Sequence, residues 1–302
     1  MANILQQRCL NVLTWHELLA GSQRKAFETH VDTPKTLVLL FDFAASLRLL
    51  SLRSDSREWR SPKCVGLFGV WVLNGEKESF YVMLGNPKKH AARHTAAHVI
   101  NVLNRAVAEL GDISAIEDIK FWSDGARTIK CSEFLATLGK EAASLGVGIC
   151  MNYFVEGHGK SRCDGSFSSL KQGVRAACVD WSQENVGAKL ESLLQKTHPK
   201  VKVVVTEADY TERTTRWNAK INNISSFYAF WLSGQWLCAM GTTSLHHNRG
   251  QWVSLESAEA IVFEEESDDD GDYVCVSEPT PDLTAKELAA LERKQQRNES
   301  TT

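Results

Sequence analysis

Apolar residues in the first third of the chain come in short continuous runs, a pattern typical of buried β-strands. One run is TLVLLFDF (36–43), and KCVGLFGVWVL (63–73) and ESFYVML (78–84) follow it. Asn74-Gly75 lies between the last two runs, and this dipeptide favours a hairpin turn because both residues tolerate positive φ. The pattern therefore predicts one strand followed by a two-stranded hairpin.

From residue 89 onward, helical spacing of apolar residues alternates with further short apolar runs. The spacing predicts helices over 89–110, about 129–145, about 166–180 and 183–196, and strands over 119–124, 147–154 and 201–207. The first two helices stop at Gly111 and Gly146, the residue type that most often ends a helix.

Three antiparallel strands followed by alternating helices and strands is the element order of the ribonuclease H-like fold, an α/β fold with a mixed sheet. We therefore expect a helical lead-in over 1–35 and a ribonuclease H-like domain over 36–210. Aromatic, strand-like runs predict a small β-rich extension over 220–263. An acidic linker and a terminal helix, opened by the capping box of Thr284 and Glu287, are expected in 264–302.

Charge adds one asymmetry to this picture. The net charge is −3, but the run from Glu264 to Asp272 alone holds seven acidic residues, so the rest of the chain is mildly basic. That balance permits a polyanionic partner.

No apolar run is long enough to span a membrane, and the N-terminus lacks a signal-peptide pattern. The eight cysteines are scattered without a CxxC pair, which favours reduced thiols in the nucleus or cytoplasm. We therefore expect a protein that is neither secreted nor bound to a membrane.

Three aspartates occupy positions where chemistry collects in open sheets. Asp42 ends the first strand, Asp124 ends the fourth, and Asp164 lies at the mouth of the helix after the fifth. In a ribonuclease H-like sheet these elements are neighbours, so the three carboxylates would bind two divalent ions that activate an attacking hydroxyl and stabilise the leaving oxygen of a phosphodiester. Oxygen ligands favour Mg²⁺ or Mn²⁺. In the simpler alternative each aspartate only caps a helix or ends a strand.

The segments that carry these aspartates are LLFDFAAS, FWSDGARTIK and NYFVEGHGKSRCDGSFSSLKQ. They resemble the successive catalytic blocks of a eukaryotic DDE/DDD transposase family, which commonly read DFAEN, SDG and HGK followed by a DG pair and a lysine. The resemblance spans about residues 36–175 and is most specific in the third block, at His158-Gly159-Lys160, Asp164-Gly165 and Lys171. It implies a metal-dependent DNA endonuclease or strand transferase in which Asp42, Asp124 and Asp164 bind the metal ions.

Two blocks depart from the family pattern. Ala45 and Ser46 replace a Glu-Asn pair, and Thr128-Ile129 stand where Gln-Phe is usual. No zinc-binding or helix-turn-helix module is recognisable before the first block. These departures favour, as an alternative, a domesticated and catalytically inactive module that binds DNA or a protein through the same surface. A ribonuclease H-like RNA nuclease is a third reading, and a homo-oligomer is left open.

The third block holds an alternative to Asp164 as metal ligand, and several basic residues. Glu156 lies only eight residues before Asp164, and we favour Asp164 because it begins the helix. Four basic residues are expected to face the nucleic acid, where basic side chains contact phosphates: His158, Lys160, Arg162 and Lys171. In the alternative interpretation, Lys160 and Arg162 are solvated loop residues without a role in binding.

Three further histidines, His90, His94 and His98, recur every four residues along the helix expected over 89–110. Such spacing suits a zinc site, but no carboxylate or cysteine completes it nearby. Their basic neighbours favour a solvated basic face.

Overall fold

The computed structural model describes residues 2–49, 63–75, 77–85, 92–111, 115–157, 162–177, 186–205, 215–218, 221–233, 236–241, 251–254 and 259–262. The helices are α1 (Ala2–Asp32), α3 (Ala92–Leu110), α4 (Ser132–Leu145), α5 (Arg162–Ala176) and α6 (Val186–Thr197), with a 3₁₀ turn η2 (Ile224–Ser226). The strands are β1 (Thr36–Leu49), β2 (Lys63–Asn74), β3 (Lys77–Gly85), β4 (Asp118–Ser123), β5 (Gly148–Tyr153), β6 (Val201–Val205), β7 (Thr215–Asn218), β8 (Ala229–Ser233), β9 (Trp236–Met240), β10 (Gln251–Ser254) and β11 (Glu259–Val262).

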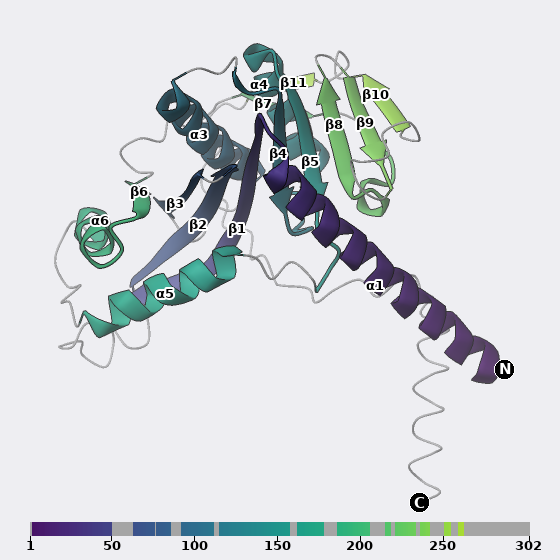
Figure 1. The fold of residues 1–302 in the computed structure, drawn as a ribbon, viewed down its shortest axis with the longest axis horizontal. Coiled ribbons are helices and arrows are strands. Elements are labelled where there is room, and N and C mark those ends of the chain that lie inside the picture. The colour runs from purple at the N-terminus through teal and green to yellow at the C-terminus, as the bar shows by residue number, and fades with distance from the viewer. Residues whose placement is uncertain are drawn as a thin grey trace, which may run out of the picture. The chain divides into compact units, whose positions relative to one another are not determined.

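A mixed sheet organises the fold, in the order β10-β9-β8-β5-β4-β1-β2-β3-β6 (Figure 1). β1, β2 and β3 are antiparallel, whereas β4 runs parallel to β1 and β5 parallel to β4. The predicted strand–hairpin–helix–strand–helix–strand order is therefore present, and the chain has an α/β fold with a mixed sheet. Gly75 takes the positive φ of 57° that the predicted hairpin turn requires.

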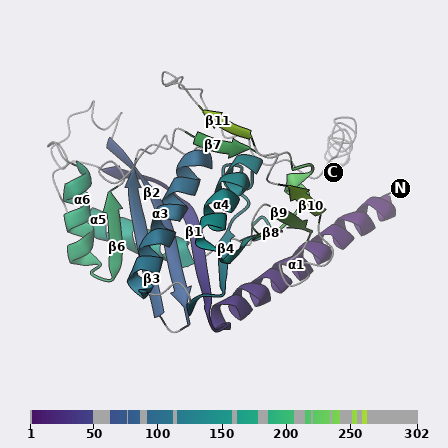
Figure 2. The same ribbon diagram turned by 90° about the horizontal axis from the view of Figure 1, so that it is seen from above.

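Helices cover both faces of the sheet (Figures 1 and 2). α3 and α4 pack on one face through a large apolar cluster that includes Phe41, Phe121 and Phe134. α1, α5 and α6 pack on the other through a second cluster that includes Leu40, Trp122 and Phe167. β-Strands with apolar residues on both sides, such as β1, are what two covered faces require.

Two expectations differ from the structure. β8, β9 and β10, expected in a separate small extension, continue the main sheet because β8 pairs antiparallel with β5. His98, expected on a solvated basic face, is only 9% exposed and stacks on Phe68 at a ring-centroid distance of 5.4 Å. Its apolar neighbours on α3, Ala97 and Val102, are buried as well, so this part of the helix packs against the core. His90, the side chain of His94, and the acidic linker and terminal helix lie outside the described residues.

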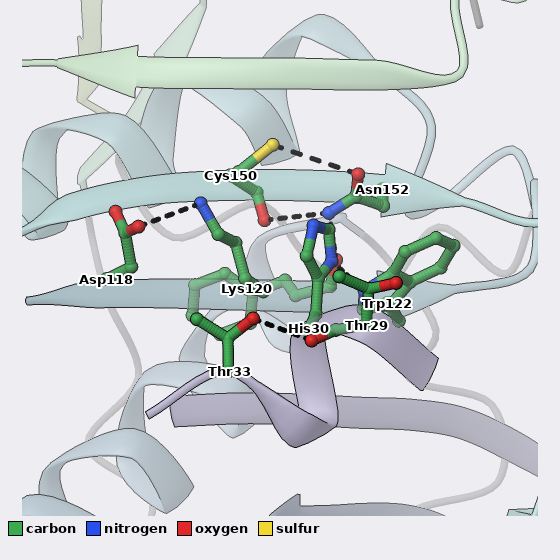
Figure 3. Close-up of polar contacts among 9 residues, drawn as sticks. Thr29, His30, Thr33, Asp118, Lys120, Trp122, Cys150 and Asn152 are labelled. Atoms are coloured by element: carbon green, nitrogen blue, oxygen red, sulfur yellow. Dashed lines mark hydrogen bonds and ion pairs between the residues drawn. The ribbon is translucent and has the colours of Figure 1, made fainter. Parts of the chain in front are cut away.

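The C-terminal half of α1 docks on the sheet through polar and aromatic contacts (Figure 3). The indole N–H of Trp122 donates to Nδ1 of His30 at 3.2 Å, and Phe27 packs edge-on against both Trp122 and Phe154. Lys120 is buried beside this pair, 3.3 Å from Asp118 and 4.4 Å from the Trp231 ring centroid. Burial and then the charge of Lys120 lower the pKa of His30 to about 4.

Lowering the pH should therefore weaken the packing of α1 on the sheet. Because the folded pKa of His30 is about 4 and its ordinary value is 6.5, the unfolded chain takes up a proton first as the pH falls. The free energy of unfolding is therefore highest above pH 6.5. It falls by at most about 3 kcal/mol as the pH is lowered from 6.5 to 4. Urea unfolding of wild type and His30→Gln over this range measures the effect. Equal pH slopes in the two proteins would contradict it.

Candidate functional site

The fold brings the three predicted aspartates toward the end of β4, but the prediction that Asp42 ends the first strand is wrong: β1 continues to Leu49, and Asp42 lies in its middle, opposite Gly69 of β2. Asp124 directly follows β4, as predicted. In the parallel pairing of β1 and β4 Leu40 lies opposite Trp122. Asp42 and Asp124 each follow two residues later, so they lie at the same position along the strand direction. Asp164 lies in the first turn of α5, the helix that packs on β1 and β2. We call Asp42, Asp124 and Asp164 the acidic cluster.

Electrostatics shows that the members of the acidic cluster act on one another. The pKa of Asp42 is raised to about 7, first by burial and then by the charges of Asp124 and Asp164. The pKa of Asp124 is also raised, mainly by burial and to a smaller extent by Asp164. Carboxylates held together in this way favour a proton or a cation between them.

Local hydrogen bonds orient the carboxylates of Asp42 and Asp124. Oδ1 of Asp42 accepts from the backbone N–H of Phe43 at 2.7 Å, and Oδ1 of Asp124 accepts from that of Ala126 at 3.2 Å. The turn after Asp124 is held from β5, where the hydroxyl of Tyr153 donates to the carbonyl of Ile129 at 2.8 Å. Each carboxylate is thus held by a backbone N–H close to it in sequence, within β1 for Asp42 and in the turn after β4 for Asp124.

A glycine lets α5 approach the acidic cluster. Gly69 on β2 lies directly opposite Asp42 in the β1–β2 register, and a Cβ at this position would stand 2.6 Å from the Phe167 ring. Phe167 lies one turn after Asp164 on α5. The missing side chain of Gly69 therefore allows the ring of Phe167 to seat α5, and with it Asp164, close to β1 and β2.

Glu156 belongs to a different group of side chains. Its charge acts on Lys130 and Tyr228 and is not among the causes that shift Asp42 or Asp124. The ammonium of Lys130 lies 4.2 Å from the Tyr228 ring centroid and donates to the carbonyl of Ser225 at 2.9 Å. Burial lowers the pKa of Lys130 to about 8.

Sequence reasoning gave Lys130 no role. It ends the FWSDGARTIK block, but its partners lie about 100 residues further along the chain. Lys130 lies beside Gly125, the residue after Asp124, where an added Cβ would be 3.8 Å from Cδ of Lys130.

The predicted basic residues have different surroundings. Arg162 forms an ion pair with Glu78 at 2.6 Å and lies over the Trp71 ring, so its side chain is directed toward β2 and β3. Lys171 is partly buried on α5, and its pKa is lowered by burial and by Arg175. His158 and Lys160 lie outside the described residues.

Metal binding depends on how closely the donors approach. Among the described residues, no group of three or more His, Cys, Asp or Glu side chains lies at the spacing of metal ligands. The acidic cluster nevertheless offers only oxygen donors, the type that Mg²⁺ and Mn²⁺ prefer. Burial first, and the charge of neighbouring aspartates second, raise the pKa of Asp42 and Asp124, and a bound cation would favour their ionised forms. The chemistry of the donors therefore suits a divalent cation.

Membrane insertion has no support in the helices, since no helix in the described ranges is both long and apolar enough to cross a bilayer.

Comparison with known proteins assigns the chain to a family. No curated protein and no solved structure matches it. A family profile described as a domain of unknown function, DUF8701, matches residues 25–229. That range runs from the docked half of α1 to the start of β8 and contains the whole acidic cluster. The chain therefore belongs to the DUF8701 family.

Proposed function

We propose that this protein cleaves DNA phosphodiester bonds by metal-dependent phosphoryl transfer on a ribonuclease H-like fold. The observation that carries the proposal is the acidic cluster, whose members come from β1, the turn after β4, and α5; the charge of Asp164 raises the pKa of both Asp42 and Asp124, and that of Asp124 raises the pKa of Asp42. The sheet order β3-β2-β1-β4-β5, with the first three strands antiparallel, supports the fold assignment. The likeness of the three sequence blocks to eukaryotic transposases supports DNA as the substrate, nuclear action and a capacity for strand transfer.

The acidic cluster would hold two Mg²⁺ or Mn²⁺ ions. Such ions lower the pKa of an attacking hydroxyl and neutralise charge on the scissile phosphate. The chain's own part is to position the carboxylates, which the backbone donors of Phe43 and Ala126 orient. Asp164 is preferred over Glu156 as the third ligand because its charge raises the pKa of both Asp42 and Asp124, whereas the charge of Glu156 acts on Lys130.

Basic residues near the cluster would contact the nucleic-acid backbone. Lys171 lies two turns after Asp164 on α5 and is partly accessible. Arg162 would first have to leave Glu78. His158 and Lys160 complete the proposed set on sequence grounds.

A catalytically inactive module that binds DNA or a protein is the second candidate. The altered residues Ala45 and Ser46 of the first block favour it. Metal binding separates the two candidates, because an inactive module has no need for an ion at the cluster.

Asp124→Asn is expected to abolish Mn²⁺-dependent nicking of supercoiled plasmid and to remove the calorimetric signal of Mn²⁺ binding. Asp32→Asn, the same change at an exposed site at the end of α1, is the matched control and should behave as wild type. Glu156→Gln should keep Mn²⁺ binding, because its charge does not bear on the cluster. Single-stranded RNA as a second substrate distinguishes a DNA nuclease from an RNA nuclease.

A wild-type protein that neither binds Mn²⁺ nor nicks DNA would establish the inactive module instead. Loss of binding in Glu156→Gln but not in an Asp164→Asn variant would show that Glu156 is the third ligand.

A further inference from the structure

Asp124 is the member of the acidic cluster that lies outside a helix or strand. Asp42 lies within β1, and Asp164 lies in the first turn of α5. The pairing of β4 with β5 ends at Ser123, opposite Tyr153, so Asp124 begins the turn that follows β4. The position of its carboxylate therefore depends on how that turn is held, because the β4–β5 pairing does not extend to it.

Backbone hydrogen bonds make the turn over residues 124–130 compact. The N–H groups of Ile129 and Lys130 both donate to the carbonyl of Ala126, at 2.9 and 2.8 Å. The N–H of Ala126 in turn donates to Oδ1 of Asp124 at 3.2 Å. A chain of hydrogen bonds therefore leads from Lys130 through Ala126 to the Asp124 carboxylate, and a displacement of Lys130 would reach that carboxylate.

Two side-chain contacts tie this turn to other parts of the sheet. The Tyr153 hydroxyl, at the end of β5, donates to the carbonyl of Ile129 at 2.8 Å. The ammonium of Lys130 donates to the carbonyl of Ser225, in η2, at 2.9 Å and lies 4.2 Å from the centroid of the Tyr228 ring. Lys130 thus links the turn to a segment 95 residues further along the chain.

The segment that receives Lys130 is itself held to the sheet. Tyr228 immediately precedes β8, and its N–H donates to the carbonyl of Met240 at 2.9 Å. Its carbonyl accepts from the N–H of Tyr153 at 2.8 Å. Because backbone pairing fixes Tyr228 from both neighbouring strands, the ammonium of Lys130 is attached to a rigid part of the fold.

Lys130 is electrostatically separate from the acidic cluster. Burial lowers its pKa and the charge of Glu156 acts in the opposite direction, whereas the three aspartates are not among the causes. Lys130 is likewise not among the causes that shift Asp42 or Asp124. With a pKa of about 8 the side chain is largely protonated at pH 7 and can donate. These observations favour an indirect role over a contact with a phosphate held at the cluster.

We propose that Lys130 is a positioning residue of the candidate site: it ties the turn after β4 to Ser225 and Tyr228 and so keeps the Asp124 carboxylate in place for a metal ion. This role rests on the phosphoryl-transfer function proposed above, because it is for a metal ion that Asp124 would be held. Side chains that orient a ligand from outside the coordination shell typically contribute about 10- to 100-fold to metal affinity.

Hydrogen exchange of the metal-free protein measures whether Lys130 holds the turn. Lys130→Met keeps most of the length of the side chain but removes the ammonium. The amides of residues 126, 129 and 130 are therefore expected to exchange roughly 10-fold faster, the scale of one hydrogen bond from a charged group. Lys130→Arg can still donate to Ser225 and should keep most of the protection. Lys196→Met, at an exposed lysine in the last turn of α6, is the matched control and should exchange as wild type.

Calorimetric titration with Mn²⁺ measures the effect on Asp124. Lys130→Met is expected to weaken Mn²⁺ binding about 10-fold or more, Lys130→Arg less, and Lys196→Met not at all. Tyr228→Leu removes the ring on the other side of the contact and should weaken binding similarly. Lys130→Met/Tyr228→Leu should bind about as weakly as the weaker single variant, because both changes act through one contact.

DNA binding distinguishes a positioning role from a phosphate contact. Fluorescence anisotropy with a duplex oligonucleotide over a series of salt concentrations is expected to give the same affinity and salt slope for wild type and Lys130→Met. Nicking by this variant should approach the wild-type rate at saturating Mn²⁺. A lysine that contacts a phosphate would instead lower the salt slope by about one on removal and leave nicking slow at saturating Mn²⁺, and this result would overturn the proposal.

Circular dichroism and thermal melting show which variants are folded, and Tyr228→Leu carries the same test if Lys130→Met does not fold. Unchanged exchange of the turn in a folded variant would overturn the role of Lys130, as would faster exchange with unchanged Mn²⁺ binding. A wild type that does not bind Mn²⁺ would overturn the proposed function and with it the role of Lys130. Failure of the positioning role alone is thus seen only in a wild type that does bind Mn²⁺.

Discussion

Asp42→Asn is expected to reduce Mn²⁺-dependent nicking by about 1,000-fold or more, the scale of losing a metal-positioning charge at about 4 kcal/mol of transition-state stabilisation. Asp42 is the central member of the acidic cluster, since both other aspartates act on its pKa. An amide keeps the size and shape of the side chain but carries no negative charge for a cation. Initial rates of plasmid nicking at saturating and limiting Mn²⁺ measure the loss.

The same substitution is expected to stabilise the protein in the absence of metal. The folded pKa of Asp42 is about 7, against an ordinary value of 3.8. Below pH 3.8 the carboxyl is protonated in both the folded and the unfolded chain and costs nothing. As the pH rises the unfolded chain ionises first, so the cost to the folded state grows up to about pH 7 and is constant above it.

Asp42→Asn removes this cost and should raise the free energy of unfolding at pH 8, without metal, by on the order of 2 kcal/mol. Urea unfolding of wild type and variant at pH 4 and pH 8 measures it, and the gain should be much smaller at pH 4. A functional residue that destabilises its own fold is expected where like charges are held together for catalysis. Equal stability at pH 8 combined with unchanged nicking would remove Asp42 from the site.

Gly69→Ala is expected to destabilise the protein by about 3 kcal/mol, at the upper end of the usual cost of overpacking. The new Cβ would meet three ring atoms within 3 Å, two of Phe167 and one of Phe80. Relief requires α5 to move away from β2, and Asp164 moves with it. We therefore also expect weaker Mn²⁺ binding, measured by calorimetry on the folded fraction.

A second substitution distinguishes packing from any direct role of Gly69. Phe167→Leu removes the ring atoms that the new Cβ meets, so Gly69→Ala/Phe167→Leu should be more stable than the sum of the two single changes predicts. Additive free energies would show that the close approach of Phe167 is not what Gly69 provides. Gly165→Ala on α5, where a Cβ meets nothing within 4 Å, is a control for glycine replacement.

Local sequence determined the secondary structure around the site. The apolar run 36–43, the Asn74-Gly75 turn and the helix ends at Gly111 and Gly146 are visible in the chain itself, because strand burial, turn geometry and left-handed caps depend on neighbouring residues. Gly111 and Gly146, which end these helices, adopt positive φ of 77° and 67°. The positions of Asp124 after a strand and of Asp164 at a helix start followed from the same local patterns, whereas Asp42 was wrongly expected to end its strand, because pairing with β2 extends β1 to Leu49.

Tertiary structure alone decided which side chains meet. No local pattern shows that β8 pairs with β5, that Phe167 packs over Gly69, or that Arg162 binds Glu78. The burial of His98 depends on Phe68 from another strand, so its charged neighbours in sequence were misleading.

The choice between Asp164 and Glu156 has the same origin. In the sequence the two acids lie only eight residues apart, and Asp164 was favoured only because it begins the predicted helix. In the fold the charge of one reaches Asp42 and Asp124, and the charge of the other reaches Lys130 and Tyr228. The sequence determined the elements and the acids they carry, and only the packing of α5 on β1 and β2 decided which of them share an electrostatic environment, because Coulomb energies depend on distances in space.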